Sequence, residues 1–352
     1  MPSKQKIRIA LDCMGGDNAP KSVIHGASII SEEFKDEIKF LFFGDKILIL
    51  HLISKFQIHC EYEIYESESN IPNETKPSTA LRGVTREFKK SSMVLAIQSV
   101  KNHESDLIIS AGNTGALMAI SRYILGTLPS IDRPAIISVI PNELSEQFVM
   151  LDLGANIGST TEDLLQLSLM GAVFGKIILK KELPRVSLLN IGEEEMKGND
   201  TIKNTYQTLK QIQNNGLFRF CGYVEPHNVF KDMTDIVVCD GFVGNVALKT
   251  MEGTASMIKK YLTQGFKSSI FGWIGYFFAK NSLKKTMKLI DPRNKNGAML
   301  IGLNGIVVKS HGSADGFAFS HAVSVGINLI KNNINEKIIN EIDKVALIFD
   351  KE

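Results

Sequence analysis

A short apolar strand, a polar glycine-bearing turn and a helix, in that order, form the pattern that most constrains this chain. The clearest case spans residues 235–253, where residues 236–238 are a continuous apolar run suited to a strand buried on both faces. Gly241 and Gly244 then interrupt the chain before a helical stretch from about Val246. In a parallel α/β sheet such a turn lies at the crevice where ligands bind.

The same order recurs along the chain. Further strands are predicted at residues 7–11, 38–43, 62–65, 106–110, 135–140, 148–151, 186–189 and 305–309. Helices are predicted from about residue 21 and at residues 45–55, 79–90, 117–125 and 162–174. Polar turns follow five of the strands, at residues 12–20, 110–116, 152–156, 190–200 and 310–315. The repetition predicts an α/β fold with a largely parallel, helix-covered sheet.

Length and charge narrow the class of protein. The 352 residues could hold two domains, but no linker or low-complexity run marks a boundary, so we expect one two-lobed body over residues 1–352. A hydrophobic fraction of 44% supports a large core. Forty basic and 38 acidic residues give a net charge of +2, which argues against a nucleic-acid binder. Local basic patches could still serve an acidic partner.

The four cysteines and the N-terminus favour the cytoplasm. Cys13, Cys60, Cys221 and Cys239 are scattered, with neither zinc spacing nor the density of a disulfide scaffold. The basic N-terminus has an apolar run interrupted by Arg8 and Asp12, which is typical of a first strand rather than a signal sequence. No stretch approaches the ~20 apolar residues of a membrane span.

The polar turns supply the candidate substrate-binding residues. The turn at 110–116 lets backbone amides approach an oxyanion closely, and Ser110 or Thr114 can donate a hydrogen bond. Neither the Walker A nor the Rossmann glycine pattern is present, so a nucleotide site lacks its main support. The alternative is that these residues only form turns and caps. The candidates are Asp12, Gly15, Gly16, Asp17, Ser110, Gly112, Asn113, Thr114, Gly115, Asn156, Asp240, Gly241 and Gly244.

Three further polar residues stand at strand ends. Asn245 lies at the mouth of the helix after residues 236–238, where it is either an N-cap or a site residue. Lys197 lies among acidic residues 193–195, so it is either a paired surface charge or a substrate contact. His311 is either structural or a proton donor, and its position is the main argument for a role in the site.

The segment at residues 266–278 contains Trp273, the only tryptophan, and five other aromatic residues. It is too short to span a bilayer, and Lys280, Lys284, Lys285 and Lys288 follow closely. We expect a helical excursion at about residues 263–296 and an amphipathic hairpin whose segment 266–289 meets a dimer mate, an acyl chain, an acidic carrier protein or a membrane surface. The alternative is a buried core helix.

Seven motifs together resemble the bacterial phosphate acyltransferases of phospholipid synthesis. They are DCMGGDNAP, SAGNTGALMA, DRPA, LDLGAN, LLNIGEEEMKGND, DGFVGNVALKTMEG and NGIVVKSHGSADGFAF, in family order across about residues 7–330. The resemblance implies a three-layer α/β/α fold similar to phosphotransacetylase and isocitrate-dehydrogenase-like proteins. It also implies reversible acyl transfer from acyl carrier protein to inorganic phosphate, giving acyl phosphate for a membrane glycerol-3-phosphate acyltransferase.

The resemblance implies a cytosolic homodimer and assigns catalytic roles to Lys197 and Asn245. Phosphate can attack a thioester directly, so the protein mainly positions two reactants and stabilises an oxyanion, with no acyl-enzyme, metal or cofactor required. His311 could protonate the departing thiolate. Residues 80–93 are longer than usual for the family, and residues 157–160 lack an acidic residue often found there.

Two alternatives differ in class. One is a nicotinamide-dependent decarboxylating dehydrogenase of similar body plan, for which the metal-binding aspartates and a substrate arginine cluster are missing. The other is a non-enzymatic module that binds an acyl chain or carrier protein.

Overall fold

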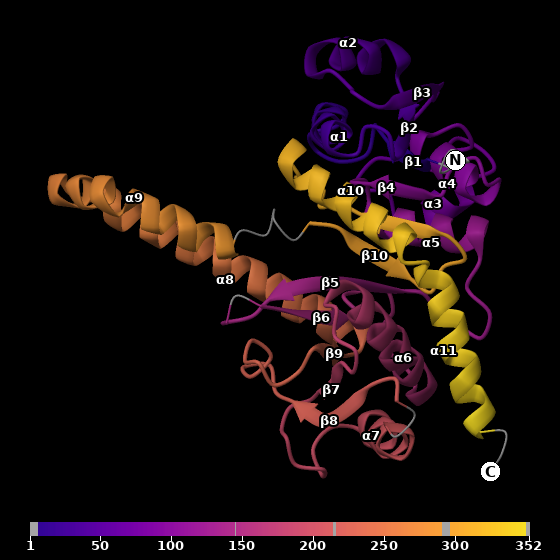
Figure 1. Ribbon diagram of the computed structural model, residues 1–352, viewed down its shortest axis with the longest axis vertical. Helices are drawn as coiled ribbons and strands as arrows, with labels where there is room; N and C mark the ends of the chain where they lie inside the picture. Colours follow the sequence, from indigo (N-terminus) through magenta and orange to yellow (C-terminus); the bar gives the residue numbers. More distant parts are fainter. Residues whose placement is uncertain (1–5, 145, 214–215, 291–295, 350–352) are drawn as a thin grey trace.

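The computed structural model describes residues 6–144, 146–213, 216–290 and 296–349. Its strands form one 11-stranded sheet in the order β3-β2-β1-β4-β11-β10-β5-β6-β9-β7-β8 (Figure 1). The strands are β1 (Ile7–Asp12), β2 (Ile38–Gly44), β3 (Glu61–Glu66), β4 (Leu107–Ser110), β5 (Ala135–Pro141), β6 (Gln147–Leu151), β7 (Arg185–Leu189), β8 (Arg219–Val224), β9 (Ile236–Val238), β10 (Ala298–Ile301) and β11 (Ile306–Lys309).

The sheet consists of two parallel halves joined by antiparallel strands. In the first half, β3, β2, β1, β4 and β11 run parallel, and in the second half β6, β9, β7 and β8 run parallel. Between them, β10 is antiparallel to β11 and β5, and β5 is antiparallel to β6. The sheet is therefore largely parallel, as predicted, but its direction reverses at the centre.

Helices cover both faces of the sheet. They are α1 (Lys21–Glu33), α2 (Lys46–Phe56), α3 (Pro77–Gly83), α4 (Ser92–Lys101), α5 (Thr114–Leu125), α6 (Thr161–Ile178), α7 (Asp200–Ile212), α8 (Gly241–Lys267), α9 (Ile270–Ile290), α10 (Gly316–Lys331) and α11 (Ile334–Phe349). One face packs against α1, α2, α6, α7, α10 and α11, and the other against α3, α4, α5 and the start of α8. This arrangement confirms the three-layer α/β/α prediction.

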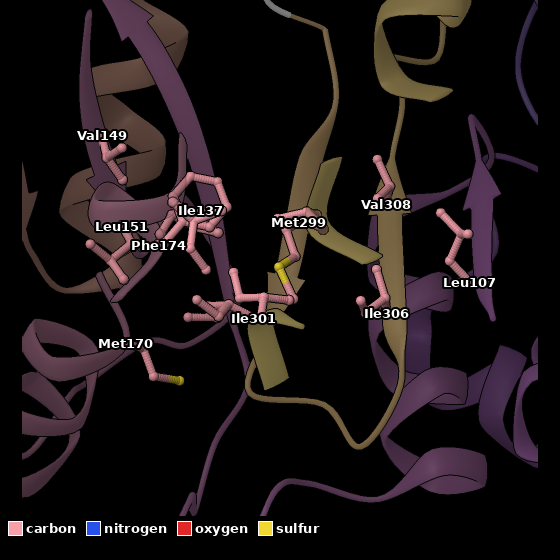
Figure 2. Packing of buried hydrophobic residues seen from close by; sticks show 14 of the residues in the cluster. Leu107, Ile137, Val149, Leu151, Met170, Phe174, Met299, Ile301, Ile306 and Val308 are labelled. Atoms are coloured by element: carbon pink, nitrogen blue, oxygen red, sulfur yellow. The ribbon is translucent and has the colours of Figure 1, made fainter. Parts of the chain in front are cut away.

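The larger core runs across both halves of the sheet. Figure 2 shows Leu107 and Val308 from the first half, Met299 from β10, and Leu151 with Phe174 from the second half, all in one hydrophobic cluster. The sequence predicts this core because short Val-, Ile- and Leu-rich strands have no polar face to turn toward water. The central antiparallel strands are thus as buried as the parallel ones.

Two predicted helices begin or end elsewhere. The helix expected at residues 79–90 ends as α3 at Gly83, where a Cβ would lie 2.3 Å from the ring of Phe88, and a series of turns follows. α4, which was not predicted, begins after Ser91, whose hydroxyl accepts a hydrogen bond from the Val94 amide. The basic charge of residues 82–90 therefore lies on turns as well as on a helix.

The helix expected from about Val246 begins five residues earlier. α8 starts at Gly241 and is capped by Asp240, so Asn245 is in the second turn and is not the N-cap. Gly241 and Gly244 lie inside the helix because close packing, described below, leaves no room for a side chain. Strands β8 and β10 and helices α7, α10 and α11 are further elements that the sequence reasoning did not identify.

Helices α8 and α9 form a hairpin that projects away from the body of the molecule (Figure 1). The excursion expected at residues 263–296 contains the end of α8 and all of α9, and residues 291–295 lie outside the described part of the chain. Large apolar residues on it are exposed, among them Ile270, Phe271, Trp273 and Phe278. The segment is therefore not a core helix. None of the helices in the described ranges is both long and apolar enough to cross a membrane.

Candidate active site

Asp12 connects the end of β1 to neighbouring segments of the first half through hydrogen bonds. It is buried at the end of β1, where its carboxylate accepts hydrogen bonds from the hydroxyls of Ser92 and Ser110, each at 2.6 Å. Burial raises its pKa, and these hydrogen bonds limit the rise. A Cβ on Gly15 would lie 2.4 Å from this carboxylate and 2.8 Å from the Gly112 nitrogen. Only glycine fits, so the turns after β1 and β4 pack directly on each other.

The turn after β11 is fixed by Asn296. The side chain of Asn296 donates to the Ser310 hydroxyl at 2.7 Å and accepts from the His311 amide at 2.8 Å. The Nδ1 atom of His311 lies 3.0 Å from the Ser313 hydroxyl. The amide of Asp17 donates to the Gly312 carbonyl at 2.8 Å, which joins this turn to the one after β1.

In the second half, a buried carboxylate again organises a turn. Asp152, fully buried at the end of β6, accepts hydrogen bonds at 2.8–3.1 Å from the amides of Ile136, Gly154, Ala155 and Asn156. The Asn156 side chain also donates to it at 3.0 Å. Burial raises the pKa of Asp152, opposed by these bonds. Asp152 therefore positions the turn at 152–156 rather than facing a ligand.

The start of α8 packs against that turn. A Cβ on Gly244 would lie 1.9 Å from the Asp152 carbonyl oxygen, and one on Gly241 would lie 2.1 Å from the Asn156 oxygen. This contact places the Asn245 side chain next to Gly154. Asp240 accepts from the amides of Phe242 and Ser159, each at 2.8 Å, which outweighs its partial burial and lowers its pKa.

A cleft of about 2860 Å³ lies between α5 and α8 over the central strands. Its floor is apolar and includes Ile136 and Ile140 of β5 and Met150 of β6. Met118 of α5 lines one wall and Asn245 of α8 the other. Residues of the polar turns line it as well, among them Asn156, Ser310 and His311, so the cleft combines apolar side chains with hydrogen-bonding groups.

The predicted site residues divide into two groups. Thr114, Gly115, Asn156, Asn245 and His311 line the cleft and come from both halves of the sheet. The remaining candidates hold the turns in place without lining it, namely Asp12, Gly15, Gly16, Asp17, Ser110, Gly112, Asn113, Asp240, Gly241 and Gly244. Among the described residues the structure thus brings together five of the predicted positions around one space.

Lys197 lies in the exposed turn after β7 and does not line the cleft. Its carbonyl accepts from the Asn190 side chain at 3.2 Å. Glu193 of the same turn accepts from Asn228 at 3.0 Å, and the neighbouring residue Val229 does line the cleft. Lys197 is therefore on an exposed turn that is attached, through Glu193 and Asn228, next to a residue of the cleft wall.

The buried thiols near the site are unreactive in character. Burial raises the pKa values of Cys13 and Cys239 well above the ordinary value, and the adjacent Asp12 and Asp152 raise them further. In the ranges covered by the structure, His, Cys, Asp and Glu side chains do not gather in a group of three that could hold a metal ion.

Comparison with known sequences identifies the family. Residues 7–337 match the sequence model of the family described as "Fatty acid synthesis protein". The chain is 43% identical over 339 residues to a phosphate acyltransferase of Ehrlichia chaffeensis, covering 96% of this chain and 99% of the relative. A phosphate acyltransferase of Paramagnetospirillum magneticum is 42% identical over 340 residues, covering 96% and 95%.

The chain belongs to the phosphate acyltransferase family. The resemblance drawn from the seven motifs is thereby confirmed, and with it the class of acyltransferase.

Solved structures show that this chain shares its fold with distant proteins. A phosphotransacetylase from Streptococcus pyogenes matches with a TM-score of 0.62 at 16% identity, covering 93% of this chain and 94% of that one. A protein described as a putative 4-hydroxythreonine-4-phosphate dehydrogenase from Salmonella typhimurium matches with a TM-score of 0.52 at 10% identity, covering 92% and 100%. The first match confirms the expected phosphotransacetylase-like fold, and the second is to a protein described as a dehydrogenase.

The cleft also contains residues that were not predicted from the sequence. Lys309, Lys249 and Arg122 line it, and Asn296 fixes the turn that carries His311. Lys309 had a detectable signal, because a lysine ending an otherwise apolar strand is costly to bury. Lys249 had one as well, since it lies four residues after Asn245 on the same face of a helix.

Proposed function

We propose that this chain reversibly transfers a fatty acyl group from acyl carrier protein to inorganic phosphate, forming acyl phosphate for phospholipid synthesis. The observation that carries the proposal is the cleft, in which polar turns meet a long apolar floor, in a member of the phosphate acyltransferase family. Its volume exceeds the roughly 300–1,000 Å³ of sites for drug-sized ligands. An acyl chain and its thioester-bearing arm need such room.

The proposed reaction is direct. A phosphate oxygen attacks the thioester carbonyl carbon, a C–O bond forms, and the C–S bond then breaks with its electron pair passing to sulfur. The sulfur takes up one proton, for which His311 is the nearest predicted donor. Asn245 would donate a hydrogen bond to the oxyanion of the tetrahedral intermediate, and the first-turn amides of α5 favour an anion. The raised pKa values of Cys13 and Cys239 support a route without an acyl-enzyme.

The partners belong to the same proposal. The exposed aromatic face of the α8–α9 hairpin supports contact with a second copy of the chain in a homodimer, with acyl carrier protein or with a membrane surface. The side chain of Lys280 is described, whereas those of Lys284, Lys285 and Lys288 lie outside the described part. A cytoplasmic enzyme with peripheral membrane contact could pass acyl phosphate to a membrane glycerol-3-phosphate acyltransferase.

The test is phosphate-dependent consumption of a long-chain acyl carrier protein by the purified protein, with acyl phosphate trapped as the hydroxamate. We expect turnover with the carrier-protein donor and little with acetyl-CoA. Turnover of acetyl-CoA alone would instead assign the chain a short-chain phosphotransacylase activity. No acyl phosphate from either donor would favour the non-enzymatic binding module, and cofactor reduction with a hydroxy acid would favour the dehydrogenase.

A further inference from the structure

Lys309 is a buried cation in the cleft wall. It ends β11, and although it is only 8% exposed it lines the cleft. Its Nζ atom donates to the Ala111 carbonyl at 3.2 Å and to the Ser310 carbonyl. No ion pair within 4.0 Å joins it to a carboxylate in the part of the chain that the structure describes. An ammonium group has three donors, so two carbonyl partners leave one hydrogen unused.

The surrounding charges do not neutralise Lys309. Burial lowers its pKa to about 8, and the field of Lys249 from α8 lowers it slightly further. Asp12 and Asp17 act in the opposite direction, but Asp12 is occupied by two serine hydroxyls and Asp17 by the Asn73 side chain. The neighbouring His311 ring contacts Ser313. Among the described residues, neither carboxylate is paired with Lys309 within 4.0 Å, and its hydrogen bonds go only to carbonyl oxygens, so its ammonium group can still pair with an anion in the cleft.

Other anion-favouring groups meet Lys309 at the same end of the cleft. The Ala111 carbonyl that it contacts begins the turn leading into α5, and Thr114 and Gly115 of the first turn of α5 line the cleft. First-turn amides have no acceptor within their own helix, and the helix dipole favours a negative charge there. Lys309 thus contributes a full positive charge next to the partial positive charges of the first-turn amides of α5.

We propose that Lys309 binds the phosphate acceptor, holding an inorganic phosphate oxyanion against the first turn of α5. This inference rests on the proposed function in that phosphate is the acyl acceptor, and it assigns the contact to a residue outside the motif-derived catalytic pair. A bound dianion supplies the acceptor for the unused donor and neutralises the buried charge. Lys309 positions the nucleophile, and the acyl donor does not depend on it.

The first test measures the thermal stability of the full chain with inorganic phosphate against chloride at equal ionic strength. We expect phosphate to raise the Tm of the wild type and of Lys331→Met, a matched change in an exposed ion pair at the far end of α10. We expect Lys309→Met to lose this rise. In the acyl-transfer assay, the phosphate KM of Lys309→Met should increase at least tenfold while the donor KM stays within twofold.

A pH profile provides the test that does not require Lys309→Met to fold. Wild-type phosphate binding should weaken as the pH rises through about 8, because the free lysine then loses its proton. Lys309→Arg should bind phosphate without that weakening, because a guanidinium stays charged. Phosphate binding by the wild type that is unchanged from pH 7 to pH 9.5 would overturn the inference, as would a folded Lys309→Met with an unchanged phosphate KM.

The outcomes separate this inference from the proposed function. Lys309-dependent phosphate binding without acyl phosphate formation from acyl carrier protein would contradict the proposed donor and leave the phosphate site standing. Normal acyl phosphate formation by Lys309→Met would contradict the phosphate site at Lys309 and leave the proposed function standing.

Discussion

Asn245 is a predicted catalytic residue that also lines the cleft. It lines the cleft on α8, beside Gly154 of the facing turn. We expect Asn245→Ala to fold normally and to lose ~10²–10³ in kcat, the usual cost of removing one oxyanion donor. Steady-state kinetics with a long-chain acyl carrier protein measure the fall in kcat, and circular dichroism shows whether the variant folds normally. A kcat within threefold of wild type would remove Asn245 from the mechanism.

Lys197→Ala tests the second role implied by the resemblance. Because Lys197 is exposed, its removal should leave the Tm unchanged. We expect turnover to fall, because the resemblance gives Lys197 a catalytic role and its turn is joined through Glu193 to Asn228, the neighbour of a cleft residue. Asn245→Ala is measured in the same assay for comparison. If the turnover of Lys197→Ala stays close to that of the wild type, Lys197 is a surface charge without a catalytic role.

The stability of the fold should improve when Lys309 loses its charge. The fall of its pKa from 10.5 to about 8 corresponds to about 3 kcal/mol, which is the cost of keeping the ion buried. Below pH 8 that cost is present in full. It diminishes between about pH 8 and pH 10.5, because there the folded chain has released the proton that the unfolded chain still holds.

Lys309→Met should therefore be at least as stable as wild type at pH 7 in phosphate-free buffer, with the advantage shrinking toward pH 10. Urea unfolding at both pH values measures this. A variant that is clearly less stable at pH 7 would mean that the bonds to Ala111 and Ser310 outweigh the desolvation cost.

For individual residues, the sequence predicted which turns are polar better than it predicted which of their residues line the cleft. The polar turns were visible because strand, turn and helix leave local signals, and five of the predicted residues do meet in the cleft. Asp12 and Gly112, predicted as substrate contacts, do not line the cleft and are placed within the packed turns after β1 and β4. Distances between residues about 100 positions apart depend on tertiary packing, which a single sequence does not encode locally.

Among the elements, the start of α8 offers a sharp comparison of two glycines in one helix. Gly244→Ala should destabilise the protein by about 1–3 kcal/mol or more, because the new methyl group would overlap the Asp152 carbonyl. Gly253→Ala, with no atom within 4 Å of its added Cβ, should stabilise it by roughly 0.5–1 kcal/mol. Thermal denaturation of both variants checks this. Equal effects would contradict the packing of α8 on the turn at 152–156.

The hairpin makes a prediction of its own. Trp273 is 61% exposed and Phe277 is 73% exposed, so changing both to Ser should leave the Tm within a degree or two. We expect the double variant to lose binding to vesicles containing anionic lipid, because each buried aromatic contributes roughly 1.5–3 kcal/mol. Tyr123→Ser, at a residue 61% exposed on α5, is the matched control.

A change in dimerisation, seen by light scattering with vesicle binding intact, would assign the exposed face to a second copy. Unchanged binding to vesicles, carrier protein and a second copy would contradict the docking proposal altogether.

The positions of helices and strands were predicted well where the local sequence pattern was typical of one kind of element, and poorly elsewhere. β9 lies at residues 236–238 as predicted, because three β-branched residues between polar neighbours have few alternatives. β10 was missed because its four residues, Ala298–Ile301, include only one β-branched residue and so lack the composition that marks β9. The start of α8 was misplaced because glycine usually ends helices, and only contact with Asp152 explains it inside one.

For the whole molecule, the continuous sheet predicts a single unfolding transition of the body. Leu107 of the first half and Leu151 of the second belong to one core that crosses the antiparallel strands, so neither half has a separate interior. Far-UV and near-UV circular dichroism should give coincident urea transitions. Two separated transitions would show that the halves are independent domains. The reversal of direction at the centre, which makes the sheet mixed, came from no local signal in the sequence.

Helix α8 also sets a distance. It runs without interruption from Gly241 at the cleft to Lys267 in the hairpin, and 27 residues at 1.5 Å each span about 40 Å. A surface touched by the far end of the hairpin would therefore be held at a constant offset from the cleft. Under the proposed function the product is a mixed anhydride, which hydrolyses readily, so the length of one helix would limit how far it travels through water before it meets the next enzyme.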